Sequence, residues 1–177
     1  FKDIDTDVAR KEYGVLYDLN IGSNKVELIV QSKCEPDYSK LLESGMITQI
    51  KTIEMENFLN NLNSGDTVRI EVLSEAYKKV PNLNSKNSRR RVITNYEEKE
   101  AWITKKISKY NCEVKKVDIT KASNNIYGYK KNMKIKYFPS KFCCIVKIND
   151  VDAFKTMIKD GIGSGKAYGM GMIKVFK

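Results

Sequence analysis

The residues best suited to chemistry lie near the carboxyl end, in the glycine-rich run GIGSGKAYGMG at residues 161–171. Five of the ten glycines of the chain fall in this run, so its backbone can adopt positive φ angles and expose its amide groups. Flanked by glycines, the Lys166 ammonium and neighbouring N–H groups can close on a phosphate. The Tyr168 ring can stack on a base or pack against a sheet. The candidate ligand contacts of this run are Gly163, Ser164, Gly165, Lys166 and Tyr168.

Two familiar glycine loops that bind nucleotides do not fit this run. A Walker A loop needs a glycine where the chain has Asp160, and a serine or threonine where it has Ala167. The dinucleotide fingerprint follows a strand and precedes a helix, whereas this run follows a predicted helix and precedes a predicted strand. The alternative to a ligand site is therefore a helix end, closed by Gly161, that continues into a tight loop.

Two further groups of cationic residues can bind a polyanion. Three consecutive arginines follow a polar segment of turn composition, and guanidinium groups form paired hydrogen bonds with phosphates or guanine edges. A predicted basic hairpin at residues 126–137 interleaves lysines with Tyr127, Tyr129 and Tyr137. The alternative for both groups is that they bind nothing: the arginines then lie in a solvated loop, and the lysines are exposed on the hairpin. The candidate contacts are Arg89, Arg90, Arg91, Lys130, Lys131, Lys134 and Lys136.

Composition limits the remaining chemistry. A net charge of +10 favours a polyanionic partner, nucleic acid before membrane. The chain has no histidine, its four cysteines show no C-x-x-C spacing, and its acidic residues are dispersed, which argues against zinc and magnesium sites. No signal-peptide pattern or membrane-spanning apolar run is present. We expect free thiols in the reducing cytoplasm, no metal and no other cofactor.

The elements that position these residues alternate between strands and helices. Strands are predicted at residues 13–19, 25–31, 47–53, 67–77, 113–119, 142–148 and 172–176, and helices at 37–43, 55–62, 94–110 and 150–160. Thr94 with Glu97 forms a predicted capping box, and Asp150 a predicted N-cap. At one constant offset, an apolar set in the first half matches one in the second: Tyr38, Leu41, Leu42 and Gly45 against Phe154, Met157, Ile158 and Gly161.

This order predicts an α+β fold of two tandem ferredoxin-like (RRM-like, βαββαβ) domains. Residues 66–177 supply a complete unit, with the basic hairpin and the glycine-rich loop as additions. Residues 1–65 supply only strand, strand, helix, strand, so we expect this first domain to lack its opening strand and helix.

The run GIGSGKAYGMGMIKV at residues 161–175 resembles the C-terminal glycine-rich signature of the CasE-type CRISPR repeat-processing endoribonucleases. These are the RNA-cleaving subunits of Cascade and belong to the RAMP superfamily of paired ferredoxin-like folds. The resemblance extends through residues 142–160 and, more loosely, to residues 89–92 and 13–18. It covers most of the chain, but only the glycine run is specific.

The resemblance implies metal-independent cleavage of precursor RNA at the base of the CRISPR repeat stem-loop. The product would carry a 2′,3′-cyclic phosphate and stay bound in the Cascade complex. The resemblance also implies that the basic hairpin enters the major groove of the RNA stem. The expected partners are the repeat stem-loop and other Cascade subunits, with neither membrane nor direct DNA contact.

In that family the catalytic histidine lies on the first helix. This chain contains no histidine, so we expect either an omitted segment before Phe1 or a fragment that binds RNA without cutting it. Two alternatives remain open: a non-catalytic RNA-binding subunit of the same superfamily, and a generic basic RNA-binding domain.

Overall fold

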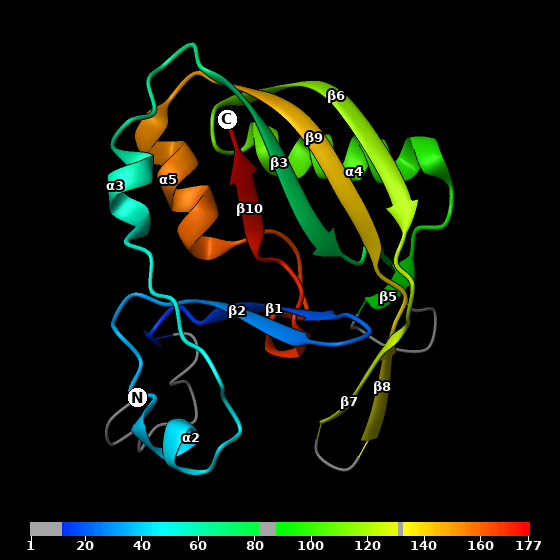
Figure 1. The fold of residues 1–177 in the computed structure, drawn as a ribbon. Helices are drawn as coiled ribbons and strands as arrows, with labels where there is room; N and C mark the ends of the chain where they lie inside the picture. Colours follow the sequence, from blue (N-terminus) through cyan, green and yellow to red (C-terminus); the bar gives the residue numbers. More distant parts are fainter. Residues whose placement is uncertain (1–11, 82–87, 131–132) are drawn as a thin grey trace.

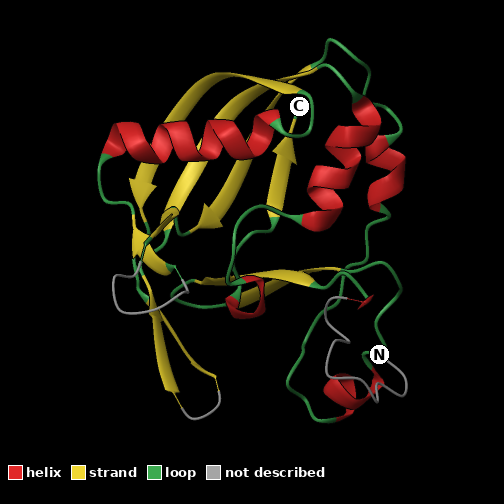
Figure 2. Cartoon of the chain, turned by 180° about the vertical axis from the view of Figure 1, so that it is seen from behind, coloured by secondary structure: helices red, strands yellow, loops and turns green. Residues whose placement is uncertain are grey.

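The computed structural model describes residues 12–81, 88–130 and 133–177 and is built around a four-stranded antiparallel sheet (Figure 1). Helices α4 (Tyr96–Ser108) and α5 (Val151–Asp160) both cover one face of this sheet, as the view from behind shows (Figure 2). The chain order strand, helix, strand, strand, helix, strand is the ferredoxin-like βαββαβ order. In space the strands follow one another as β10 (Ile173–Phe176), β3 (Thr67–Ser74), β9 (Ser140–Ile148) and β6 (Cys112–Lys121).

The core of the molecule lies between this sheet and its helices. Along β9 every second side chain points inward, because successive residues of a strand face opposite sides of the sheet. The inward residues of β9 and the apolar stripes of α4 and α5 together form a core from which water is excluded, which stabilises the sheet. These buried residues include Phe142, Cys144, Val146, Ile148, Ile103, Ile107, Phe154, Met157 and Ile158.

Side-chain caps fix where the two long helices begin. The Asp150 side chain accepts a hydrogen bond from Ala153 N at 3.0 Å, which confirms the predicted N-cap of α5. The cap of α4 lies one residue later than predicted. Asn95, rather than Thr94, accepts from a backbone N–H, that of Glu98 at 2.9 Å.

Three two-stranded hairpins extend from this body. They are β1–β2 (Leu16–Ile21 with Val26–Gln31), β4–β5 (Tyr77–Val80 with Arg89–Val92) and β7–β8 (Ile126–Lys130 with Met133–Tyr137). The single strand predicted at residues 67–77 is wrong in its extent, since β3 ends at Ser74 and β4 begins at Tyr77. The three arginines predicted in a loop instead form β5, because β4 gives them a partner strand.

The strand predicted at residues 47–53 is not formed. In the complete unit the last strand, β10, pairs with the first, β3. In the N-terminal part β1 and β2 pair only with each other among the described residues, so the segment at 47–53 has no first strand to join. An unpaired strand cannot satisfy its backbone hydrogen-bonding groups within the fold, and this segment forms neither strand nor helix.

The two short helices of the N-terminal part differ in their packing. Helix α2 (Ser39–Glu43) leaves Leu41 and Leu42 exposed, although their predicted counterparts in α5 are fully buried. Helix α3 (Met55–Leu59) and the following turn send Leu59 and Leu62 into the core of the four-stranded sheet. Within the described parts of the chain, no helix is both long and apolar enough to cross a lipid bilayer.

Candidate nucleic-acid interface

The glycine-rich run forms a compact loop between α5 and β10 that folds against the end of β3. Gly171 N donates to Leu73 O at 2.8 Å, and Ile162 N donates to Gly171 O at 2.9 Å. Gly163 has a φ of +90°, and a Cβ atom there would overlap the Ser74 hydroxyl. This position therefore requires glycine for its conformation and for the close approach to β3.

Tyr168 lies in the short 3-10 helix η1 (Lys166–Tyr168) and connects the glycine loop to the β7–β8 hairpin. Its ring packs against Gly128, where any Cβ atom would collide with the ring. Its hydroxyl donates to Tyr129 O at 3.1 Å. The ring that was predicted either to stack on a base or to pack on a sheet thus packs on this hairpin.

Arg90 connects β5 to the same region. Its guanidinium lies 2.6 Å from Glu75 Oε2 and 3.9 Å from the centroid of the Tyr77 ring. Arg89 and Arg91 are on the opposite face of β5, because side chains alternate along a strand. Both are exposed and form no ion pair with the described residues.

The lysines of the β7–β8 hairpin differ in how far the structure describes them. Lys134 and Lys136 are exposed on β8, and their ammonium groups lie 5.2 and 5.4 Å from the centroid of the Tyr127 ring. A hydrogen bond with Lys136 is the main reason why the pKa of Tyr127 is lowered. Lys130 ends β7 opposite Met133, and Lys131 lies outside the described residues.

Two candidate side chains of the glycine loop are turned toward the body of the protein. The Lys166 ammonium donates to the carbonyl of Asp160, at the C-terminal end of α5, where the helix dipole favours a cation. The Ser164 hydroxyl is buried, with no hydrogen-bond partner among the described residues. Neither side chain extends freely from the loop in this arrangement.

Tyr137 is where the three predicted groups meet. Its ring centroid is 5.4 Å from that of Tyr168 and 5.5 Å from the Arg90 guanidinium. A Cβ atom on Gly165 would lie 3.5 Å from the same ring. Burial raises the pKa of Tyr137. The structure thus brings the arginine strand, the lysine hairpin and the glycine loop together around one aromatic ring.

Sequence reasoning missed Glu75, which organises this region. Its side chain is buried and accepts hydrogen bonds from the Arg90 guanidinium and from Phe138 N. The available signal was weak: an acidic residue directly after an alternating apolar strand and before Ala76. Charged residues are rarely buried without a partner, so a carboxylate at that place indicates a nearby cation.

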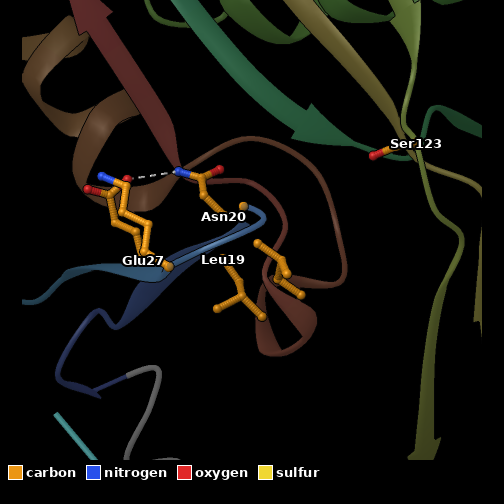
Figure 3. A pocket seen from close by; sticks show the side chains of 7 residues that line it. Leu19, Asn20, Glu27 and Ser123 are labelled. Carbon is orange, nitrogen blue, oxygen red and sulfur yellow. Dashed lines mark hydrogen bonds between the residues drawn. The ribbon is translucent and has the colours of Figure 1, made fainter.

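A pocket lies at the tip of the β1–β2 hairpin, next to Ser123 (Figure 3). Leu19, Asn20, Glu27 and Ser123 contribute to its lining, and Asn20 Nδ2 donates to Glu27 Oε2 at 3.3 Å. The pocket has a single lysine, Lys25, and no arginine among its lining residues. In the portion of the chain that the structure describes, no three His, Cys, Asp or Glu side chains are grouped for a metal ion.

Comparison with known proteins gives one family and several solved structures. The family model of the CRISPR associated proteins matches residues 2–176. Cse3 of Thermus thermophilus, bound to an RNA representing a pre-cleavage complex, has a TM-score of 0.71 and 19% identity, over 92% of this chain and 78% of that one.

Two further structures have the same fold. The CRISPR endoribonuclease Cse3 bound to 19 nt RNA has a TM-score of 0.68 and 16% identity, over 97% of this chain and 85% of that one. Cas6e from Escherichia coli K-12 has a TM-score of 0.67 and 16% identity, over 91% of this chain and 83% of that one. A search of curated proteins found no match. The likeness confirms the predicted α+β class with tandem ferredoxin-like domains.

Proposed function

Because the chain belongs to the family of CRISPR associated proteins, we propose that it binds the stem-loop of a CRISPR repeat RNA. The family match and the shared fold confirm the resemblance to CasE-type proteins predicted from residues 161–175. The observation that carries the proposal is the meeting of arginine strand, lysine hairpin and glycine loop at Tyr137.

Within the proposed interface the exposed cations bind the RNA backbone. Arg89, Arg91, Lys134 and Lys136 are exposed, so they can reach phosphates without first breaking a buried contact. Phosphate contacts of this kind supply affinity and position the protein on the RNA, but carry little sequence information. Lys130, which ends β7, and Lys131, which lies outside the described residues, are further candidates for phosphate contacts.

We propose that Arg90, Tyr168 and Lys166, which already make contacts within the protein, shape the interface and do not bind RNA themselves. Arg90 and Tyr168 hold the two hairpins and the glycine loop together, and the engagement of Lys166 with Asp160 O fixes the loop. We propose that the backbone of Gly163, Ser164 and Gly165, shaped in this way, lies along the RNA beside the hairpin. This assignment gives all the predicted residues a role, although only some of them touch the ligand.

The second part of the proposal is RNA cleavage. Two of the solved structures that share the fold are the CRISPR endoribonuclease Cse3 bound to 19 nt RNA and Cse3 bound to an RNA representing a pre-cleavage complex. We propose cleavage at the base of the stem without a metal ion, by attack of the 2′-hydroxyl on the adjacent phosphate. That reaction leaves a 2′,3′-cyclic phosphate, and the product then stays in the Cascade complex in the cytoplasm.

Such cleavage needs a general base for the 2′-hydroxyl and a general acid for the leaving 5′-oxygen. The 177 residues contain no histidine, the side chain most often used for both steps. We therefore assign to these residues the binding and positioning of RNA. The same absence favours the alternative function, a non-catalytic RNA-binding subunit of the same superfamily.

Gel-shift titration tests the binding proposal. The cognate repeat hairpin and an unrelated hairpin of equal length are compared, with the expectation that the cognate RNA binds more tightly. Equal affinity for both would overturn the specificity. Replacing Arg89, Arg91, Lys134 and Lys136 by glutamate is expected to abolish binding and reduce its salt dependence.

Cleavage is tested separately, with the product of the native gene and repeat RNA in the presence of EDTA. A fragment ending in a cyclic phosphate supports the enzyme. Binding without any cleavage supports the non-catalytic subunit instead.

A further inference from the structure

The glycine-rich loop passes around strand β1 and contacts both of its faces. Successive side chains of a strand point to opposite faces, so Leu16 and Tyr17 lie on different sides of β1. An added Cβ atom on Gly161, at the start of the loop, would lie 2.8 Å from the Leu16 side chain. An added Cβ atom on Gly169, near its end, would lie 3.0 Å from the Tyr17 ring. Strand β1 therefore lies between the start and the later part of the loop.

Two further contacts hold the β1–β2 hairpin beside this loop. Asp18 forms an ion pair with Lys174 of β10, just after the loop. Their side chains are only 15% and 28% exposed, so water screens this pair less than a surface pair. Gln31 Nε2 donates to Ile158 O at 3.0 Å, in the last turn of α5 just before the loop. The hairpin is thus attached to the chain on both sides of the loop.

Tyr17 contacts the middle of the loop, the short helix η1. Its hydroxyl donates to Ala167 O at 3.1 Å. Figures 1 and 2 show η1 on the opposite side of the β1–β2 hairpin from β10. None of the three residues of η1 is buried, so core packing does not determine where η1 lies. Its position depends instead on the contacts that it makes with neighbouring strands.

The helix η1 is in contact with both β1 and β7. Ala167 O accepts a hydrogen bond from Tyr17, and the next residue, Tyr168, packs against Gly128 and donates to Tyr129 O. Consecutive residues of η1 therefore bind the β1–β2 hairpin and the β7–β8 hairpin. Because these contacts share one short helix, a shift of η1 would change the position of the β7–β8 hairpin.

From these contacts we infer that Tyr17 is a positioning residue of the proposed RNA interface. It holds η1 in place, and η1 in turn holds the β7–β8 hairpin against the glycine loop. The RNA affinity of the C-terminal unit thus depends on a side chain of the N-terminal part, which acts through η1 and does not bind the RNA. This inference deepens the proposed function and depends on it.

The expected effect is a moderate loss of affinity. Without the Tyr17 side chain η1 is less ordered, and RNA binding must order it again. This ordering lowers the affinity even though no contact with the RNA is removed. We expect Tyr17→Leu to weaken binding of the repeat stem-loop about 2- to 12-fold, which corresponds to the loss of one hydrogen bond.

Hydrogen exchange and RNA titration of the full chain test the inference together. Tyr17→Leu is expected to accelerate amide exchange in η1 and in the β7–β8 hairpin, and to leave exchange in β3 and β9 unchanged. Titration with the cognate repeat stem-loop should show the loss of affinity given above. Tyr17→Phe keeps the ring against Gly169 and loses only the hydroxyl, so it should retain part of the protection and part of the affinity.

Leu28→Ala is the matched control. Leu28 belongs to the neighbouring cross-strand pair on the same face of the β1–β2 hairpin as Tyr17, and it is 56% exposed. This substitution should change neither the exchange in η1 nor the affinity for RNA.

Faster exchange throughout the four-stranded sheet in Tyr17→Leu would indicate a general loss of stability and overturn the inference. Unchanged exchange in η1 would overturn it as well. If the wild type binds the repeat stem-loop and Tyr17→Leu binds it equally tightly, only this inference fails. If the wild type binds no RNA, the proposed function fails and the inference with it.

Discussion

Glu75 and Arg90 form a partly buried ion pair that joins two hairpins of the proposed interface. Glu75 Oε2 lies 2.6 Å from the Arg90 guanidinium, and Glu75 Oε1 accepts from Phe138 N at 2.7 Å. Phe138 directly follows β8, so one carboxylate fixes the base of the β7–β8 hairpin relative to β5. The position of this hairpin, which we propose binds RNA, is thereby set by a residue that is itself buried.

Glu75→Gln is expected to lower the free energy of unfolding by about 1–3 kcal/mol, because a buried charge-assisted hydrogen bond is lost. Arg90 keeps a third of its side chain in solvent, which limits the cost of leaving it unpaired. Urea unfolding measures the change. RNA affinity should fall as well, since the hairpin loses its fixed orientation.

Glu98→Gln provides the control for this prediction. Glu98 pairs with Lys78 at 2.8 Å, but both side chains are almost half exposed. Exposed pairs contribute only about 0–1 kcal/mol, so this change should alter neither stability nor RNA affinity measurably. Equal effects of the two substitutions would contradict a special role for Glu75.

Gly163→Ala is expected to destabilise the protein by more than the cost of its backbone conformation alone. A residue with a Cβ atom at positive φ costs about 1–2 kcal/mol, and here the added atom also collides with Ser74. Gly65→Ala isolates the first effect, because Gly65 has a φ of +96° and nothing within 4 Å of an added Cβ. Thermal unfolding compares the two variants.

The same two variants test whether the glycine loop has a role in RNA binding. Gly163→Ala should weaken binding to the repeat hairpin at a temperature where the variant is folded, and Gly65→Ala should not. Unchanged binding in the Gly163 variant would favour a generic basic RNA-binding domain, for which the loop has no role.

The C-terminal unit was predictable because its local patterns agree with its packing. The alternation along β9 and the apolar stripe of α5 each match the face that is buried. The segment at 47–53 has a similar apolar pattern but no partner strand. Pairing between distant segments decides whether such a segment forms a strand, and local pattern does not contain that information.

The candidate site was predictable by residue type and not by role. Glycine, arginine and lysine clusters marked the three segments that meet at Tyr137. Which cations are free depends on tertiary partners: Arg90 is paired because Glu75 is buried beside it, and Lys166 is turned toward the end of α5. Glu75 lies 15 residues before Arg90. The contact of Lys166 is with a backbone carbonyl at the end of a helix, which residue types do not indicate.

The four free cysteines are expected to differ in reactivity toward a thiol reagent. Burial raises the pKa of Cys112 to about 11 and that of Cys144 to about 12, so both stay protonated and unreactive at pH 8. Cys34 is exposed and should react first. In the native protein, fewer thiols should therefore react with Ellman's reagent than the four that react in denaturant. Rapid reaction of all four thiols in the native state would contradict the buried positions of Cys112 and Cys144.

Gly128 and Tyr168 are expected to be energetically coupled. Gly128→Ala places a methyl group against the Tyr168 ring, so the hairpin must shift from the glycine loop, with loss of stability and RNA affinity. Tyr168→Ala removes the ring and makes room for the methyl group. In a double-mutant cycle the second change should therefore recover part of the loss caused by the first, with a coupling of about 0.5–3 kcal/mol.

Gly22→Ala, in the β1–β2 turn where an added Cβ meets only Lys25 O at 3.4 Å, is the control and should show no coupling to Tyr168. Strict additivity of Gly128→Ala and Tyr168→Ala would show that the hairpin is not held by this contact.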